Sequence, residues 1–153
     1  MNPVARALIG TLGLAPLPGE GGYYRVTWRG AHGSAILFLI TPEDFSALHR
    51  IAQDELWHFH SGDPVEHVRI DPVTGEATII RLGADIARGE TPQLAVPAGH
   101  WQGARTAAGP HGYALLGCTV TPPWTPEGFE LGAREALAAA FPRHAAWIAR
   151  LTR

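Results

Sequence analysis

Residues 49–63 read His-Arg-Ile-Ala-Gln-Asp-Glu-Leu-Trp-His-Phe-His-Ser-Gly-Asp, and this stretch decides how the fold is interpreted. It places three histidines, acidic residues and a tryptophan between a short loop and a Gly-Asp turn. Thirty-four residues after that turn comes a second segment, Pro-Ala-Gly-His-Trp-Gln at 97–102. Together the two segments predict the halves of a small-molecule site inside a β-barrel. They also resemble a metal site that has lost some of its ligands.

The sequence around these segments predicts an all-β fold. Short β-rich runs alternate with turn clusters at 22–29, 34–40, 45–50, 54–60, 65–71, 76–82, 93–97 and 111–121. Residues 71–75, Asp-Pro-Val-Thr-Gly, have the composition of a hairpin turn. Many short strands at this spacing indicate a sandwich or barrel. No helical stretch long enough for a crossover lies between them, which argues against a parallel α/β sheet.

Helices are expected only at the two ends of the chain. Residues 2–11 have near-helical apolar spacing and are followed by a proline-rich turn. Residues 132–141 and 143–151 are Ala-rich and amphipathic, and Pro142 separates them. We therefore expect one domain over 1–153, with the barrel at about 20–121 and a C-terminal helical segment at about 130–152.

Composition excludes several classes of protein. The net charge of −2 gives no electrostatic basis for binding nucleic acid or an anionic membrane. All twelve basic residues are Arg, which excludes a Schiff-base Lys or a P-loop Lys. The single cysteine, Cys118, excludes an internal disulfide and a Cys-based zinc cluster, and we expect it to be a buried small apolar residue. No apolar run reaches 18 residues, so we expect a cytoplasmic protein with no membrane partner.

A family resemblance rests on six separated motifs that occur in order. They are Glu-Gly-Gly-Tyr-Tyr-Arg at 20–25, His-Arg at 49–50, Asp-Glu-Leu-Trp-His at 54–58, Gly-Asp-Pro at 62–64, Val-Pro-Ala-Gly-x-Trp-Gln at 96–102, and Gly-Cys-Thr-Val at 117–120. From about residue 8 to 150 the chain resembles the cupin-5 type of the cupin superfamily, a small family long labelled a domain of unknown function. The resemblance implies a double-stranded β-helix, or jelly-roll, barrel.

The metal site of cupins is only partly present in this resemblance. His49 stands where the first metal-binding His would be, Ile51 occupies the second position, and Glu55 keeps the carboxylate. The third His is replaced by Gln102, with His100 displaced by two residues. A neutral amide oxygen is a weak ligand for Zn²⁺ or Fe²⁺. We therefore expect no cofactor, with a divalent metal on His49, Glu55 and Gln102 as the alternative.

Strand alternation sorts the side chains of residues 54–60. If Glu55 points into the barrel, Trp57 and Phe59 point inward too, either as core or as a surface on which a ligand stacks. The opposite face then carries Leu56, His58 and His60. For Arg25 two interpretations stay open: an ordinary surface residue, or an inward-facing clamp for an anion beside Glu55.

These residues predict a small-molecule site with acid–base character. Burial brings the pKa values of a carboxylate and an imidazole toward neutrality, as proton abstraction next to a carbonyl requires. His49 would act as base and Glu55 as its partner, while Arg25, Trp57, Phe59 and Gln102 would contact the ligand. We expect a carbohydrate-like or keto-acid ligand and a metal-independent epimerase, isomerase or lyase. Whether the protein is an enzyme stays open, because a non-catalytic ligand-binding or sensor cupin and a weak metal-dependent enzyme are the alternatives.

A second copy of the chain is the one macromolecular partner that the resemblance suggests. Small cupins commonly dimerise through the edges of their sheets. Trp28, His58 and His60 would suit such an interface if they face outward. We therefore expect a homodimer.

Overall fold

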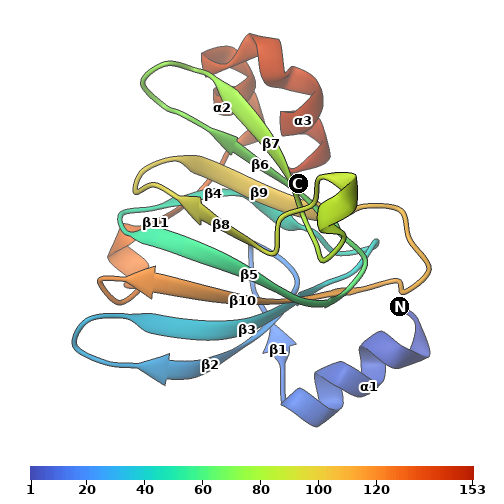
Figure 1. Cartoon of the computed structure of the whole chain (residues 1–153). Helices are drawn as coiled ribbons and strands as arrows, with labels where there is room; N and C mark the ends of the chain where they lie inside the picture. The colour runs from blue at the N-terminus through green and yellow to red at the C-terminus, as the bar shows by residue number, and fades with distance from the viewer.

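The chain is described over residues 1–153 by a computed structural model, in which two antiparallel sheets face each other (Figure 1). The first sheet has six strands in the order β1-β2-β3-β10-β5-β8. Their bounds are β1 Ala15–Pro16, β2 Tyr23–Arg29, β3 Ser34–Ile40, β10 Ala114–Thr121, β5 Asp54–Gly62 and β8 Gln93–Val96. Every pair of neighbouring strands in this sheet is antiparallel.

The second sheet has five strands in the order β11-β4-β9-β6-β7. Their bounds are β11 Phe129–Leu131, β4 Ser46–Ile51, β9 Trp101–Thr106, β6 Val65–Ile70 and β7 Ala77–Leu82. The turn predicted at 71–75 joins β6 to β7, where the Asp71 carboxylate accepts hydrogen bonds from the amides of Val73 and Thr74. The predicted all-β architecture is confirmed.

Three strands are absent from the sequence prediction. They are β1, β9 and β11, and the last two matter most because they carry side chains of the candidate site. β9 lies between β4 and β6 in the middle of the second sheet, and β11 adds an edge strand to β4. The strands therefore continue to Leu131, ten residues beyond the predicted end of the barrel at 121.

The main core fills the space between the two sheets. Its buried members come from inward-facing positions of both sheets, and Phe38 packs edge-on against Trp57 at a centroid distance of 5.9 Å. Burial of such side chains contributes about 1.5–3 kcal/mol each to folding. The core residues are Phe38, Ile40, Trp57, Val65, Leu82, Leu94, Val96, Ala104, Ala114, Leu116 and Cys118.

Helices cover the outer faces of the sheets, and they lie at the two ends of the chain as predicted (Figure 1). α1, Pro3–Leu12, packs against the outer side of the first sheet, and its N-terminus is capped by Asn2, whose side chain accepts a 2.8 Å hydrogen bond from the Ala5 amide. α2, Arg134–Ala140, and α3, Ala145–Arg150, pack against the outer side of the second sheet. Three short 3-10 turns, η1 Ile86–Arg88, η2 Pro126–Gly128 and η3 Pro142–His144, complete the chain.

The C-terminal segment is bonded to the backbone of β4. The Leu48 amide donates to the Leu151 carbonyl at 2.7 Å, and the Leu48 carbonyl accepts from the Gly132 amide at 2.7 Å. The Leu48 side chain is fully buried among the residues of α2 and α3. The residues that cover β4 from outside therefore fix the backbone next to His49.

One glycine of the predicted motifs is required by backbone geometry. Gly62 ends β5 with a φ of 102°, in the left-handed region that favours glycine. A Cβ atom at this position would also collide with the carbonyl oxygen of Tyr113. Gly62 thus allows the chain to turn from β5 toward β6, Val65–Ile70, beside the loop that leads into β10.

None of the helices is both long enough and apolar enough to span a membrane.

Candidate functional site

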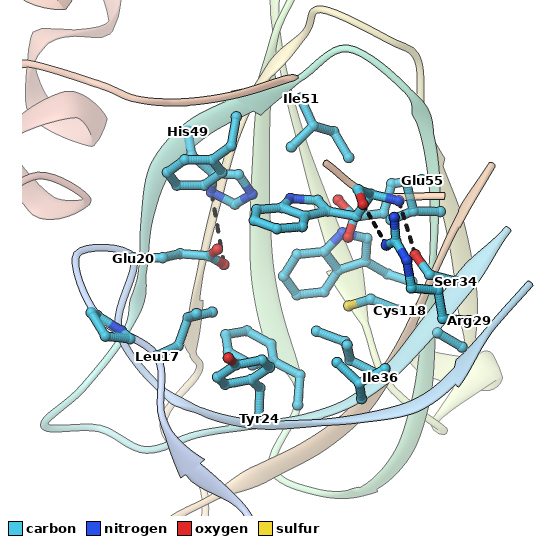
Figure 2. A pocket seen from close by; sticks show the side chains of 18 residues that line it. Leu17, Glu20, Tyr24, Arg29, Ser34, Ile36, His49, Ile51, Glu55 and Cys118 are labelled. Carbon is cyan, nitrogen blue, oxygen red and sulfur yellow. Dashed lines mark hydrogen bonds and ion pairs between the residues drawn. The ribbon is translucent and has the colours of Figure 1, made fainter. Parts of the chain in front are cut away.

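A cavity of about 360 Å³ occupies one end of the space between the sheets (Figure 2). Eighteen residues line it, and twelve of them are apolar. Its polar groups come from β2, β3, β4, β5, β10 and the turn before β2, and the segment 124–129 closes part of its wall. We call this the cavity end of the barrel. The side chains with titratable or polar groups are Glu20, Tyr24, Arg29, Ser34, His49, Glu55, Trp57, Cys118 and Trp124.

His49 is held in one orientation on β4. Its Nδ1 lies 2.8 Å from the Ala47 carbonyl oxygen, which can only accept, so Nδ1 carries the proton. Glu20 Oε1 lies 3.8 Å from the same nitrogen. The Phe129 ring stacks on the imidazole, with 5.6 Å between the two ring centroids. Nε2 makes no hydrogen bond within the protein, so in the neutral ring it presents a free lone pair at the cavity.

Glu55 lies on β5 across the cavity from β4 and is only 7% exposed. Burial is the main cause that raises its pKa to about 7, because the charged carboxylate loses its hydration. The charge of Glu20 raises the pKa further, whereas His49 and a hydrogen bond from Gln102 act in the opposite direction. Near neutral pH a large fraction of Glu55 is therefore protonated and can donate a proton.

Gln102 holds Glu55 from behind, on the side away from the cavity. Its amide oxygen accepts hydrogen bonds from Trp57 Nε1 at 2.9 Å and from His67 Nε2 at 3.2 Å. Its amide nitrogen donates to Glu55 Oε2 at 2.5 Å. Because the indole can only donate, the amide oxygen must face Trp57, and the NH₂ group must face Glu55.

This arrangement decides where Glu55 carries its proton. Oε2 accepts from the Gln102 NH₂ group, so a proton on Oε2 would face another donor. The proton of the neutral acid therefore lies on Oε1. The Gln102 amide thus orients Glu55 as an acid, and its two donors from Trp57 and His67 prevent the amide from rotating.

The metal ligands implied by the family resemblance do not fit a metal in this arrangement. An amide oxygen has two lone pairs, and both of those on Gln102 are used by Trp57 and His67. Gln102 is fully buried and does not line the cavity. No group of three or more His, Cys, Asp or Glu side chains is arranged to hold a metal ion. Of the implied set, only His49 and Glu55 face the cavity.

Trp57 and Phe59 differ in whether their side chains reach the cavity. Trp57 lines it and is almost fully buried. Phe59 is half-buried and packs against the core, but it lies beyond the cavity along β5, where apolar side chains fill the barrel. Trp57 is therefore positioned to contact a ligand, and Phe59 is positioned as core.

Arg25 lies outside the cavity. It pairs with Leu37 across β2 and β3, and directly opposed residues share a face of the sheet. The Leu37 side chain packs in the cluster under α1, on the outer side of the first sheet. Arg25 is exposed there, so of its two interpretations the structure favours the surface residue.

His58 and His60 lie on the outer face of the first sheet. His58 Nδ1 accepts from the Gln93 amide at 3.0 Å, and its Nε2 lies 3.3 Å from Thr119 Oγ1. The register of β5 against β10 shifts between Leu115 and Leu116, so His60 is an extra residue in its strand and its ring lies over Gly117. The two rings therefore face away from the cavity, as strand alternation predicts.

The sequence prediction overlooked several residues of the site. Glu20, Trp124 and Phe129 line the cavity, and His67 supports Gln102 from the buried interior. Glu20 belongs to a quoted motif, and a carboxylate beside a Gly-rich turn was a usable signal. For the other three no local signal exists, because their positions depend on contacts between distant segments.

Cys118 also lines the cavity, and its position makes it inert. Burial raises the pKa of the Cys118 thiol well above its usual range, and the carboxylates of Glu55 and Glu20 raise it further. A nucleophilic cysteine requires the thiolate. Cys118 therefore contributes a neutral apolar surface, as the sequence predicts.

Comparisons with known proteins agree on the fold. The sequence profile of Cupin_5, described as Cupin superfamily (DUF985), matches residues 6–132. The crystal structure of a protein from Shewanella oneidensis is similar with a TM-score of 0.91 and 38% identity, covering 97% of both chains. A hypothetical protein from Leishmania major has a TM-score of 0.89 and 34% identity, covering 97% of this chain and 98% of that one.

A more distant structure supports the barrel alone. A cupin 2 conserved barrel domain protein from Rhodopseudomonas palustris has a TM-score of 0.63 and 16% identity, covering 92% of this chain and 91% of that chain. At this identity the likeness concerns the fold and not the activity. A search of curated proteins gives no match to the chain.

Proposed function

This chain belongs to the Cupin_5 family of the cupin superfamily, and we propose that its barrel binds a small organic molecule and moves a proton on it without a metal. One observation carries the proposal. The unbonded Nε2 of His49 and the acid Glu55 line the same apolar cavity. A base and an acid on the walls of one cavity can remove a proton at one position of a ligand and supply one at another. This is the chemistry of an epimerase or isomerase.

The two residues have distinct roles in this proposal. His49 Nε2 takes a proton from a carbon next to a carbonyl group, and the Nδ1 contact to Ala47 keeps the ring in the required tautomer. Glu20, near Nδ1, stabilises the imidazolium that forms. Glu55 donates the proton on Oε1 to the carbonyl oxygen. Gln102 is a positioning residue, since it acts on Glu55 and not on the ligand.

The lining of the cavity supports a less polar ligand than the carbohydrate or keto acid suggested by the sequence. A sugar exposes hydroxyl groups on all sides, and buried hydroxyls without partners destabilise a complex. Twelve of the eighteen lining residues are apolar. A molecule with a mainly apolar body and one polar group suits these walls better.

Hydrogen exchange in D₂O tests the proposal before any natural substrate is known. Small aldehydes and ketones are incubated with the protein, and deuterium incorporation next to the carbonyl is followed by NMR. We expect exchange catalysed by the wild type, and a decrease by about 10²–10⁴-fold in His49→Gln. His58→Gln, which replaces a histidine on the outer face, is the matched control and should exchange at the wild-type rate. Exchange by His49→Gln at the wild-type rate would show that His49 is not the base.

A non-catalytic binding protein is the second candidate function. The enclosed and mainly apolar lining, with Cys118 unreactive, is equally suited to retaining a ligand unchanged. The same compounds would then bind to the wild type and to His49→Gln with equal affinity. No deuterium would be incorporated by either protein.

We also propose that the protein forms a homodimer through the outer face of the first sheet. Trp28 is 49% exposed and Leu56 is 38% exposed on this face, next to His58 and His60. Exposed apolar side chains that gather on one face are typical of an interface between copies. Light scattering coupled to size exclusion should give twice the chain mass for the wild type and a monomer for Trp28→Glu. A monomeric wild type would contradict the dimer.

A further inference from the structure

The charges that line the cavity are unevenly distributed between its interior and its rim. Glu20 and Glu55 provide two carboxyl groups inside, and Figure 2 shows His49 next to Glu20, with Glu55 on the other side of the cavity. The only guanidinium of the lining belongs to Arg29, which is exposed, and its Nη1 donates to the Trp124 carbonyl at 2.6 Å. The interior therefore has an acidic excess and no permanent cation.

An anionic ligand would meet the carboxylate of Glu20 at short range. A like charge in a poorly solvated site is unfavourable, because water is not available to screen it. A carboxylate or phosphate group would have to remain at the rim with Arg29, whose guanidinium is already bonded. The arrangement thus disfavours anions.

Glu20 has one oxygen free for a ligand. Oε1 accepts from Ser46 Oγ at 2.7 Å and lies near His49 Nδ1, whereas Oε2 makes no hydrogen bond within the protein. Only about 12% of the Glu20 side chain is exposed, and it lines the cavity. A carboxylate in such a position gains most from a group that brings both hydrogen-bond donors and a positive charge.

The walls around Glu20 are aromatic as well as apolar. Tyr24, Phe38, Trp57 and Phe129 all contribute rings to the lining. The faces of aromatic rings attract cations, and they also pack against apolar bodies. The walls and the carboxylate therefore favour the same kind of molecule.

We propose that the cavity selects a small, mainly apolar molecule that carries one protonated amine, with the ammonium group on Glu20 and the apolar body against the aromatic walls. This inference rests on the proposed function only in taking the cavity as the ligand site. Proton transfer by His49 and Glu55 is not required for it.

A matched series of ligands tests the sign of the charge. 2-Phenylethylamine, 2-phenylethanol and phenylacetate have similar size and differ in being cationic, neutral and anionic near pH 7. Titration calorimetry of the wild type should rank them amine, alcohol, carboxylate, with the amine at least tenfold tighter than the alcohol. Tenfold corresponds to about 1.4 kcal/mol.

Two substitutions in the cavity and one control outside it locate the site of amine binding. Glu20→Gln keeps an acceptor for Ser46 but removes the charge, so it should weaken the amine at least tenfold and change the alcohol less than twofold. Glu135→Gln, the same change on exposed α2, is the control and should change neither. Ile36→Trp fills the cavity and should abolish binding of the amine and the alcohol.

The possible outcomes separate this inference from the proposed function. Phenylacetate binding as tightly as the amine, and lost in Ile36→Trp, would overturn the amine while leaving the cavity as a ligand site. Amine binding that survives Ile36→Trp would place it elsewhere and overturn the inference. Absence of binding by all three compounds at millimolar concentration would also overturn it, while the exchange experiment would still decide the roles of His49 and Glu55. If Glu20→Gln fails to fold, the ranking by the wild type decides alone.

Discussion

Two histidines lie inside the barrel, and they differ in what surrounds them. His49 lies at the cavity end with Nε2 free, whereas His67 on β6 is fully buried behind Trp57 and donates Nε2 to Gln102. Burial is the main cause that lowers the pKa of His67 to about 3, and its Nδ1 has no partner. Burial thus keeps His67 neutral. Proton chemistry requires the open space that only His49 adjoins.

The largest change in the free energy of unfolding is expected at acid pH, and it should come from the buried His67. The folded state excludes a proton from His67 until pH falls to about 3, while an unfolded histidine takes one up near 6.5. Stability from this residue is therefore present above pH 6.5 and is lost as pH falls toward 3, by up to about 5 kcal/mol. Urea denaturation between pH 7 and 4 should show a steeper loss for the wild type than for His67→Gln.

The control for this prediction is His32→Gln, at an exposed position, which should follow the wild type at every pH. Parallel loss of stability in the wild type and His67→Gln would show that His67 is not the cause. If His67→Gln does not fold, NMR of the imidazole in the wild type gives the same information. The His67 ring should then show no protonation above pH 4.

Removing the hydrogen bonds of Gln102, which connect Glu55 at the cavity to the buried His67, should cause the next largest change in the free energy of unfolding. Gln102→Leu keeps most of the side-chain volume but leaves three buried groups unpaired, on Trp57, His67 and Glu55. At about 1–3 kcal/mol for each unsatisfied group, we expect a loss of about 4 kcal/mol in the free energy of unfolding. Gln93→Leu, on an exposed strand where only His58 is a partner, should cost less than about 1 kcal/mol. Equal losses would mean that the Gln102 bonds do not matter.

Glu55 should make the smallest contribution to the pH dependence of the free energy of unfolding. Its contribution is lost as pH rises, whereas that of His67 is lost as pH falls. Its folded pKa of about 7 lies above the ordinary 4.5, so the folded state holds a proton that the unfolded state has released. This contribution is fully present below pH 4.5 and is lost as pH rises through 7, by up to about 3 kcal/mol. The unfolding free energy of the wild type, measured by urea denaturation, should therefore fall relative to that of Glu55→Gln between pH 4.5 and 8. A constant difference would contradict the raised pKa.

The strands could be predicted wherever β-branched and apolar residues are dense. The run 34–40 matches β3 at both ends, and the run 76–82 differs from β7, Ala77–Leu82, by one residue. β9, Trp-Gln-Gly-Ala-Arg-Thr, could not be recognised, because it contains a glycine and polar residues and its pairing with β4 and β6 supplies what local propensity lacks. β11 is only three residues long and exists because it pairs with β4.

In the candidate site too, local sequence predicted some features, and others depend on contacts between distant segments. Strand alternation from Glu55 was enough to predict that Trp57 faces inward and that His58 faces outward. It could not predict that Gln102 lies behind Glu55, since that depends on two donors contributed by β5 and β6. Nor could it predict that the cavity ends before Phe59, because the extent of an empty space is set by packing from both sheets.

The hydrogen bonds of Leu48 give the C-terminal helices a part in the site that they never touch. The amide of Leu48, the residue before His49, bonds to Leu151, and its carbonyl bonds to Gly132. The C-terminal segment that carries α2 and α3 therefore supports β4 from outside. These bonds fix the backbone of the residue next to His49. We expect that substitutions which break these two backbone hydrogen bonds change ligand binding at the cavity without altering any cavity wall.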